Sequence, residues 1–261
     1  MKRTLTVPDL STVPSDFHAM LSGVRVYDSS CSKEARVLFI DRDQGYFLKS
    51  APKGSLQAEA AMTAFFHQKG LGAEVLAYTT GEQDWLLTSR VLGEDCTWRP
   101  YLDQPLRLCD TVASRLRMLH EVDFSGCPVA DHTKRYFETA ERNYREEKYD
   151  TSLFPDNWGY ATAKEAWDEV ERNGHLLKNE VLLHGDYCLP NIMLDNWRFS
   201  GFIDVGNGGV GDRHIDLFWG AWTLEFNLGT DRYRDRFFDA YGRDRVEKDK
   251  LRTVAAFEVF G

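Results

Sequence analysis

The chain has 261 residues, 43% of them hydrophobic and 28% charged, which is the composition of an ordered globular protein of one or two domains rather than of a linker or a disordered tail. Lys and Arg number 32 against 41 Asp and Glu, and the formal charge of −9 argues against nucleic acid or an anionic membrane as the main partner. The five cysteines are widely spaced and form no C-x-x-C pair, so neither a disulfide framework nor a zinc site is indicated.

No apolar run approaches the roughly 18 to 20 residues that a membrane-spanning helix needs. The first residues, MKRTLTVPDLSTVPSDF, contain no continuous apolar region that could act as a signal peptide. We therefore expect a cytoplasmic protein without membrane contact, present as a monomer or a weak dimer.

The first 93 residues predict a small β-rich lobe. The segment from Asp41 to Gly45 (DRDQG) is typical of a hairpin connection, and Gly81 is typical of a turn. Strand-like runs at 37–40 and 46–49 flank the first turn, and runs at 73–80 and 84–91 flank the second. A further strand-like run at 24–27 precedes them. The pattern predicts an antiparallel sheet of five strands.

One helix is predicted between the third and fourth of these strands. Ser55 is expected to cap its N-terminus, apolar or small residues follow at helical spacing from Leu56 to Ala64, and Gly70 ends it. This helix should be amphipathic and pack on the sheet.

After Gly93 the pattern is mainly helical. In one helical segment Val112, Leu116 and Leu119 share a face. Helix-like segments stand at 106–123, 160–173 and 231–244, and short strand-like runs that end in polar residues stand at 180–186, 191–195 and 199–206.

Two lobes follow from this change of pattern, with a cleft expected between them. Residues 1–93 form the small five-stranded antiparallel lobe with one helix, and residues 94–261 form a larger, mainly helical lobe. The expected fold class is α+β.

Three oxygen-bearing side chains stand in the otherwise apolar, aromatic-rich stretch 182–209: Asp186, Asn191 and Asp204. Mg²⁺ prefers oxygen ligands and usually takes one or two from protein and the rest from water and substrate phosphate, which suits Asn191 and Asp204. A neighbouring acid can accept a hydrogen bond from an attacking hydroxyl, which suits Asp186. Taken singly, such residues more often make turn hydrogen bonds, and it is their combination that favours chemistry.

Lys49 and Glu59 supply the other parts that phosphoryl transfer from ATP needs. Lys49 ends a strand and Glu59 lies in the first turn of the following helix. A lysine is a flexible point charge, and a carboxylate can fix its direction toward nucleotide phosphates. Each residue alone is also compatible with an ordinary surface position.

The segments LLHGDYCLPNIML and GFIDVGNGGVGDRHIDL are similar to the kinase pattern of antibiotic kinases, and they most resemble the aminoglycoside 3'-phosphotransferase (kanamycin kinase) family. This resemblance implies a two-lobed protein-kinase-like fold, with residues 1–93 as a nucleotide-binding lobe that ends in the interlobe connector and residues 94–261 as the catalytic and acceptor-binding lobe. It implies transfer from ATP, with Mg²⁺, to a hydroxyl of an aminoglycoside, expected to be the 3'-hydroxyl, which would give antibiotic resistance.

The resemblance also implies roles for single residues. Asp186 would be the catalytic aspartate, with Asn191 and Asp204 as magnesium ligands. Lys49 would contact the α- and β-phosphates and Glu59 would orient it. The remaining roles are phosphate contacts at Ser29 and Ser30, adenine contacts by the backbone of Ser89 and Val91, and bracing of the catalytic loop by His184 and Asp216.

Two departures from protein kinases are visible. The turn YDSSCSKEA contains no glycine, so hydroxyls and backbone amides would contact the phosphates. Only a short segment separates Asp204 from Asp216, which leaves no room for a long phosphorylatable activation segment. We therefore expect a constitutively active small-molecule kinase.

A polycationic acceptor would need several carboxylates near the attacking hydroxyl. The family's arginine after I-D-x-G is Asn207 here, and a common acceptor-binding glutamate is replaced by Phe226, which could retune the substrate. Basic residues alternate with the acidic ones in the run that holds Glu146, Glu147 and Asp150, so a solvated helix face is at least as good an interpretation of this run. The acceptor candidates are Glu146, Glu147, Asp150, Asp156, Glu225, Glu258 and the terminal carboxylate of Gly261.

Two alternatives stay open. A kinase of choline, homoserine, fructosamine or a similar small alcohol would share the same ATP machinery. A pseudokinase that binds nucleotide without transfer usually lacks a lysine, aspartate or asparagine that this chain retains at Lys49, Asp186 and Asn191.

Overall fold

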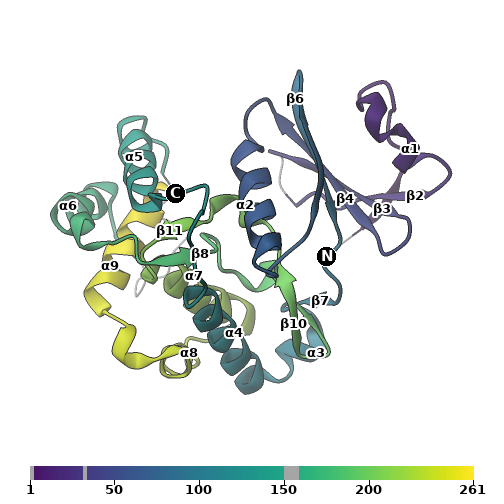
Figure 1. Cartoon of the computed structure of the whole chain (residues 1–261). Coiled ribbons are helices and arrows are strands. Elements are labelled where there is room, and N and C mark those ends of the chain that lie inside the picture. Colours follow the sequence, from purple (N-terminus) through teal and green to yellow (C-terminus); the bar gives the residue numbers. More distant parts are fainter. Residues whose placement is uncertain (1–2, 32–33, 150–158) are drawn as a thin grey trace. The chain divides into compact units, whose positions relative to one another are not determined.

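The first part of the chain forms an antiparallel sheet of six strands, in the order β1-β2-β3-β4-β6-β5. Figure 1 labels four of them, β2, β3, β4 and β6. The computed structural model describes residues 3–31, 34–149 and 159–261. The strands are β1 Thr4–Thr6, β2 Arg25–Asp28, β3 Arg36–Asp41, β4 Tyr46–Pro52, β5 Val75–Thr80 and β6 Gln83–Ser89. The five predicted strands are all present. The predicted number was wrong by one, because β1 is a short and largely exposed edge strand without the alternation that signals a half-buried strand.

One face of this sheet packs on residues that precede β2. Leu38, Leu48 and Leu87 are cross-strand neighbours and belong to one buried apolar cluster. Apolar side chains from the 3₁₀ turn η1 (Ser15–Phe17) and the short helix α1 (His18–Leu21) join the same cluster. The sequence did not predict α1, because four residues are too few to show a helical period.

Helix α2 (Gln57–Gln68) covers the other face of the sheet. Its Ala60 packs with Ala51 of β4 and Leu86 of β6. Lys49 stands directly opposite Leu86 in the antiparallel register, so both side chains leave the sheet on the α2 side. This register is what directs Lys49 toward the helix.

The two ends of α2 differ in how well the sequence predicts them. Ser55 was expected to cap the helix, but its hydroxyl donates to the carbonyl of Pro52 at 2.6 Å. The amide of Leu56 instead donates to Oδ2 of the buried Asp84, 3.0 Å away, so the predicted cap was wrong and a carboxylate from β6 replaces it. At the other end Gly70 adopts φ of +71°, the left-handed conformation that commonly ends helices.

The chain divides into two compact units. Unit 1 consists of Met1–Cys96 and Pro190–Asn207, and unit 2 of Thr97–Leu189 and Gly208–Gly261. The boundary at residue 93 stays a prediction about domains. Residues 190–207, which that boundary assigns to the second lobe, cluster with unit 1.

Short strands explain this placement of residues 190–207. Strand β9 (Ile192–Asp195) pairs antiparallel with both β10 (Arg198–Phe202) and β7 (Glu94–Asp95). After β10 the chain passes into the 3₁₀ turn η5 (Val205–Asn207), which packs on α2. Unit 1 therefore holds Asn191 and Asp204 together with Lys49.

Unit 2 is mainly helical, as predicted. Val112, Leu116 and Leu119 share a buried face of α4, which packs on α7 and α8. A two-stranded sheet is formed by β8 Val181–Leu183 and β11 Gly209–Gly211. The helices are α3 Arg99–Leu102, α4 Pro105–His120, α5 His132–Arg145, α6 Ala163–Asn173, α7 His214–Leu228, α8 Arg234–Tyr241 and α9 Lys248–Phe257, with 3₁₀ turns η3 Gly174–Leu176, η6 Arg243–Arg245 and η7 Glu258–Phe260. The 3₁₀ turn η4 (Leu189–Asn191) begins in unit 2 and ends in unit 1.

None of the helices in the described ranges is long and apolar enough to cross a membrane. All five cysteines are free.

Candidate active site

Lys49 and Glu59 form an ion pair inside unit 1. Nζ of Lys49 lies 2.9 and 2.7 Å from the two carboxylate oxygens of Glu59 and 3.2 Å from Oδ1 of Asp204. Burial alone would lower the pKa of Lys49, but the carboxylates of Asp204 and Glu59 outweigh it and raise that pKa above its ordinary value. The group is therefore a fixed ammonium with a defined direction.

Burial has the larger effect on Glu59. Desolvation raises the pKa of this carboxyl group, and the ammonium of Lys49 only partly offsets that rise. The pair is thus a desolvated one, and breaking it would leave a buried charge without its partner.

The chain turns sharply at Asp204 to reach this pair. Asp204 has φ of +58°, in the left-handed region that aspartate tolerates better than most residues. At Gly206 a Cβ atom would lie 3.1 Å from Cβ of Glu59, so glycine lets η5 approach α2 without displacing Glu59 by a few tenths of an ångström. The amide of Ile203 donates to the carbonyl of Asn191 at 3.0 Å, which places the backbone of Asn191 beside that of Asp204.

These residues fit a magnesium ion by their chemistry. Asp204 offers a half-exposed carboxylate and Asn191 a buried amide oxygen, both on adjoining loops of unit 1. Among residues 3–31, 34–149 and 159–261 no group of three or more His, Cys, Asp or Glu side chains could hold a metal ion. A hard cation here would take its remaining ligands from phosphate and water, which is the usual manner of Mg²⁺.

The predicted phosphate and adenine contacts also lie in unit 1. Ser29 and Ser30 stand in the connection from β2 to β3, where Oγ of Ser30 accepts from the amide of Val37 at 2.9 Å. Ser89 ends β6, and its amide donates to the carbonyl of Glu74, so its backbone could offer adenine only the carbonyl. Val91 is buried just after it.

Asp186 lies in unit 2, in a loop whose backbone amides are hydrogen-bonded to one carboxylate. Oδ2 and Oδ1 of Asp216 accept from the amides of His184 and Gly185, each at 2.8 Å. The amide of Asp186 donates to Nδ1 of His184 at 3.3 Å. Gly185 has φ of +82°, which explains why glycine stands there. The two residues expected to brace this loop, His184 and Asp216, both hydrogen-bond to its backbone.

His120 supports Asp216 in turn and was not singled out by the sequence. Burial lowers the pKa of His120, and the attraction of Asp216 does not fully compensate, so the ring is neutral. A carboxylate can only accept, so Nε2 donates to Oδ2 of Asp216 at 3.2 Å and Nδ1 accepts from the hydroxyl of Tyr241 at 2.8 Å. Its only sequence signal is its place at the end of a strongly amphipathic helix.

Glu258 is the acceptor candidate that is electrostatically coupled to Asp186. Oε1 of Glu258 accepts from the hydroxyl of Tyr136 at 2.6 Å and from Nε1 of Trp219 at 3.0 Å. Burial raises its pKa to about 7, the two hydrogen bonds oppose that rise, and the charges of Asp186 and Asp216 add to it. Neither Tyr136 nor Trp219 was predicted, because no local pattern links them to Glu258.

The other acceptor candidates lie in different settings. Glu225 forms an ion pair with Arg234 at 2.6 Å. Glu146 pairs with Lys148 at 2.6 Å on an exposed surface, as the solvated-face interpretation expected, and Glu147 is exposed beside it. Gly261 is exposed at the C-terminus. The remaining two candidates, Asp150 and Asp156, lie outside the described residues.

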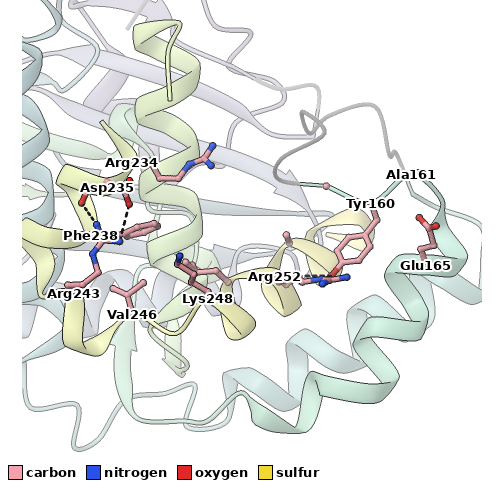
Figure 2. Close-up of a pocket in the computed structure, with 13 residues that line it drawn as sticks. Tyr160, Ala161, Glu165, Arg234, Asp235, Phe238, Arg243, Val246, Lys248 and Arg252 are labelled. Carbon is pink, nitrogen blue, oxygen red and sulfur yellow. Dashed lines mark hydrogen bonds and ion pairs between the residues drawn. The ribbon is translucent and has the colours of Figure 1, made fainter. Parts of the chain in front are cut away.

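A cavity of about 640 Å³ in unit 2 does not coincide with these residues. It lies among α6, α8 and α9 (Figure 2), and none of the predicted site residues lines it. Its arginines already have partners: Arg243 pairs with Asp235 at 3.0 Å, and Nε of Arg252 lies 3.3 Å from the hydroxyl of Tyr160. The cavity is therefore separate from the predicted chemistry.

Comparison with known proteins identifies the family. Residues 28–253 match the model of the phosphotransferase enzyme family. A probable aminoglycoside 3'-phosphotransferase of Lactococcus lactis is 51% identical over 254 residues, which cover 97% of both chains. The aminoglycoside 3'-phosphotransferase of Niallia circulans is 29% identical over 82% of this chain and 83% of its own.

Solved structures share the fold. The crystal structure of an aminoglycoside 3'-phosphotransferase of type VIII has a TM-score of 0.75 at 23% identity, covering 99% of this chain and 94% of that one. The aminoglycoside phosphotransferase APH(3'')-Id from Streptomyces rimosus, in complex with ADP and streptomycin, has a TM-score of 0.69 at 23% identity, covering 87% and 91%. The kinase-like α+β fold is thus confirmed, and the chain belongs to the phosphotransferase enzyme family and, within it, to the aminoglycoside 3'-phosphotransferases.

Proposed function

We propose that this protein transfers the γ-phosphoryl group of ATP to a hydroxyl group of an aminoglycoside, the 3'-hydroxyl. The observation that carries this function is the desolvated ion pair of Lys49 and Glu59 with Asp204 beside it, which is an arrangement suited to nucleotide phosphates. The printed names of the relatives support the same acceptor class and position.

Unit 1 is assigned the phosphate side of the reaction. Lys49 would contact the α- and β-phosphates, with Glu59 keeping its ammonium in one direction. Asn191 and Asp204 would hold Mg²⁺, which when bound would offset charge on the phosphate oxygens. Ser29 and Ser30 would contact the phosphates, and the backbone of Ser89 and Val91 would contact adenine.

Unit 2 is assigned the acceptor side. Asp186 would accept the proton of the attacking hydroxyl as the new O–P bond forms and the bond from Pγ to the β,γ-bridging oxygen breaks, which releases ADP. Asp216 would keep the carboxylate of Asp186 in place by holding two successive amides of its loop. Glu258 would attract an ammonium group of the acceptor, and Glu225 is a weaker candidate because Arg234 already pairs with it.

In the cell this activity would give antibiotic resistance. We infer a cytoplasmic location, because ATP is the expected donor, and a monomer or weak dimer as the working form.

One experiment tests this function directly. The purified protein is mixed with Mg²⁺ and ATP and with a panel of kanamycin-type aminoglycosides, choline, homoserine and a fructosamine. ADP release is followed by a coupled assay, and the product is analysed by mass and NMR. Phosphate on the 3'-hydroxyl of an aminoglycoside is expected. If only choline, homoserine or the fructosamine is phosphorylated, the proposed acceptor class is wrong and that compound is the acceptor. Nucleotide binding without any turnover would indicate a pseudokinase.

A further inference from the structure

Three aromatic side chains follow one side of α7, at positions 219, 222 and 226. The ring centroids of Trp219 and Trp222 lie 5.3 Å apart with an edge-on angle of 82°. The rings of Trp222 and Phe226 lie 5.0 Å apart and are nearly parallel, at 13°. Helical spacing of three and four residues makes these side chains neighbours.

The outer end of this row is open to solvent. Phe226 has 69% of its surface exposed, although most of α7 is buried. Among the residues that the structure describes, Trp222 is the only aromatic partner of the Phe226 ring. A large apolar side chain that is stacked and yet this exposed leaves a ring edge and face available to a ligand.

The inner end of the row touches the predicted acceptor region. Nε1 of Trp219 donates to Glu258 at 3.0 Å, and the charge of Asp186 acts on that carboxyl group. From position 219 to position 226 a helix rises about 10 Å, which is on the order of the length of two sugar rings. The row therefore leads from the acceptor candidate Glu258 out to the surface.

The acidic residue next to the outer end of the row is already paired. Glu225, beside Phe226, is paired with Arg234 at 2.6 Å. A ligand group that reaches this end therefore meets ring surface rather than an unpaired carboxylate. The apolar C–H face of a sugar and its ammonium substituents both interact favourably with aromatic rings.

We propose that Trp222 and Phe226 form a stacking surface for an outer sugar ring of the acceptor, while Glu258 binds an amine of a ring closer to the reacting hydroxyl. This rests on the proposed function and adds a specificity-determining surface to it. Acceptors with a ring beyond the two-ring core gain affinity from the surface, and shorter acceptors do not.

Kanamycin B and its two-ring fragment neamine test this, because they differ by one outer sugar. Phe226→Ala should raise KM for kanamycin B about 3- to 10-fold, the range for losing one aromatic contact, with kcat, KM for ATP and KM for neamine unchanged. Phe226→Tyr should restore the wild-type KM, since the ring is kept. Leu106→Ala removes another exposed apolar side chain of unit 2, 55% exposed, and should change none of these values.

Acceptor binding without ATP separates failure of the surface from failure of the proposed function. Isothermal titration calorimetry of wild type and Phe226→Ala with kanamycin B measures this affinity. If wild type phosphorylates kanamycin B but Phe226→Ala keeps its KM and affinity, the stacking surface is wrong and the function stands. If wild type binds kanamycin B, loses affinity on Phe226→Ala and yet transfers no phosphate, the surface stands and the kinase function is wrong. Absence of both binding and turnover overturns both.

Discussion

Nζ of Lys49 lies 2.7 Å from Oε2 of Glu59, and this pair spans the sheet and the helix of unit 1. Lys49→Ala should lower kcat/KM for ATP roughly 10- to 100-fold, the range for losing a hydrogen bond to a charged group. Steady-state kinetics with varied ATP measures this. Lys53→Ala is the matched control, because Lys53 is an exposed lysine directly after the end of β4, and this variant should leave ATP kinetics unchanged.

Asp186→Ala should lower kcat by about two to four orders of magnitude, because a positioned acid/base group is lost, while the affinity for ATP stays nearly the same. Asp195→Ala, at an exposed aspartate that ends β9, serves as the control for loss of an acidic side chain. A residual rate within tenfold of wild type would contradict the role of Asp186.

Gly185→Ala should lower both stability and turnover. At φ of +82° a Cβ atom costs roughly 1–2 kcal/mol, and relief of this strain would displace the loop that carries Asp186. Gly54→Ala is a matched control, since Gly54 has φ of +84° and open space around it, far along the sequence from the loop. Both variants should lose a few degrees of Tm, roughly 2–4 °C per kcal/mol, but only Gly185→Ala should lose kcat. Equal kcat values in the two variants would show that the loop tolerates the strain.

Glu258 should make acceptor binding depend on pH near neutrality. Its pKa is raised to about 7 by burial, so its carboxylate forms as the pH rises through that value. KM for a cationic acceptor should therefore fall between pH 6 and pH 8, and Glu258→Gln should remove this fall, as measured by kinetics across that range. A KM profile that is the same in wild type and in Glu258→Gln would refute the assignment.

The raised pKa of Glu258 should also affect stability: rising pH improves acceptor binding but lowers the free energy of unfolding. The folded state holds the Glu258 proton more tightly than the unfolded state, so this group lowers the free energy of unfolding as the pH rises from the ordinary carboxyl pKa toward about 7. Glu258→Gln keeps an acceptor for Tyr136 and Trp219 without the charge. At pH 8 the Tm of Glu258→Gln should equal or exceed that of wild type. The difference in Tm, variant minus wild type, should be larger at pH 8 than at pH 5, and a smaller difference at pH 8 would contradict the predicted direction.

Asp212 should stabilise the fold above acidic pH. It is fully buried, and the hydrogen bonds from His214 and from backbone amides hold its pKa at about 2 despite the opposing effect of burial. This contribution is complete above the ordinary aspartate pKa and is lost as the pH falls through about 2. It amounts to about 2 kcal/mol. Asp212→Asn should lose at least this much at pH 7 in urea unfolding, while Asp235→Asn, at an 85% exposed side chain, should stay within about 0.5 kcal/mol.

The sequence predicted best those features that local patterns encode. The strands, the helix ending at Gly70 and the buried face of α4 follow from periodicity and glycine, and the structure confirms them. The residue types needed for phosphoryl transfer could be named from spacing and resemblance, but spacing alone could not show that Lys49 and Leu86 share the sheet face on which α2 lies.

Long-range contacts account for what the sequence did not predict. Asp84 replaces Ser55 at the start of α2 only because β6 brings it there. Likewise, Glu258 receives its hydrogen bonds from Tyr136 and Trp219, which lie 122 and 39 residues away along the chain. No local pattern encodes such partners, because they depend on how the helices of unit 2 pack.

The loop that carries Asp186 is held by contacts made wholly within unit 2, and Asp216 is at their centre. Two successive backbone amides of this loop donate to the two carboxylate oxygens of Asp216. Asp216 and the neutral His120 ring that donates to it are both buried. These contacts form as part of the folding of unit 2. The amount of folded protein should therefore set the amount of this loop that is in place for the reaction proposed above.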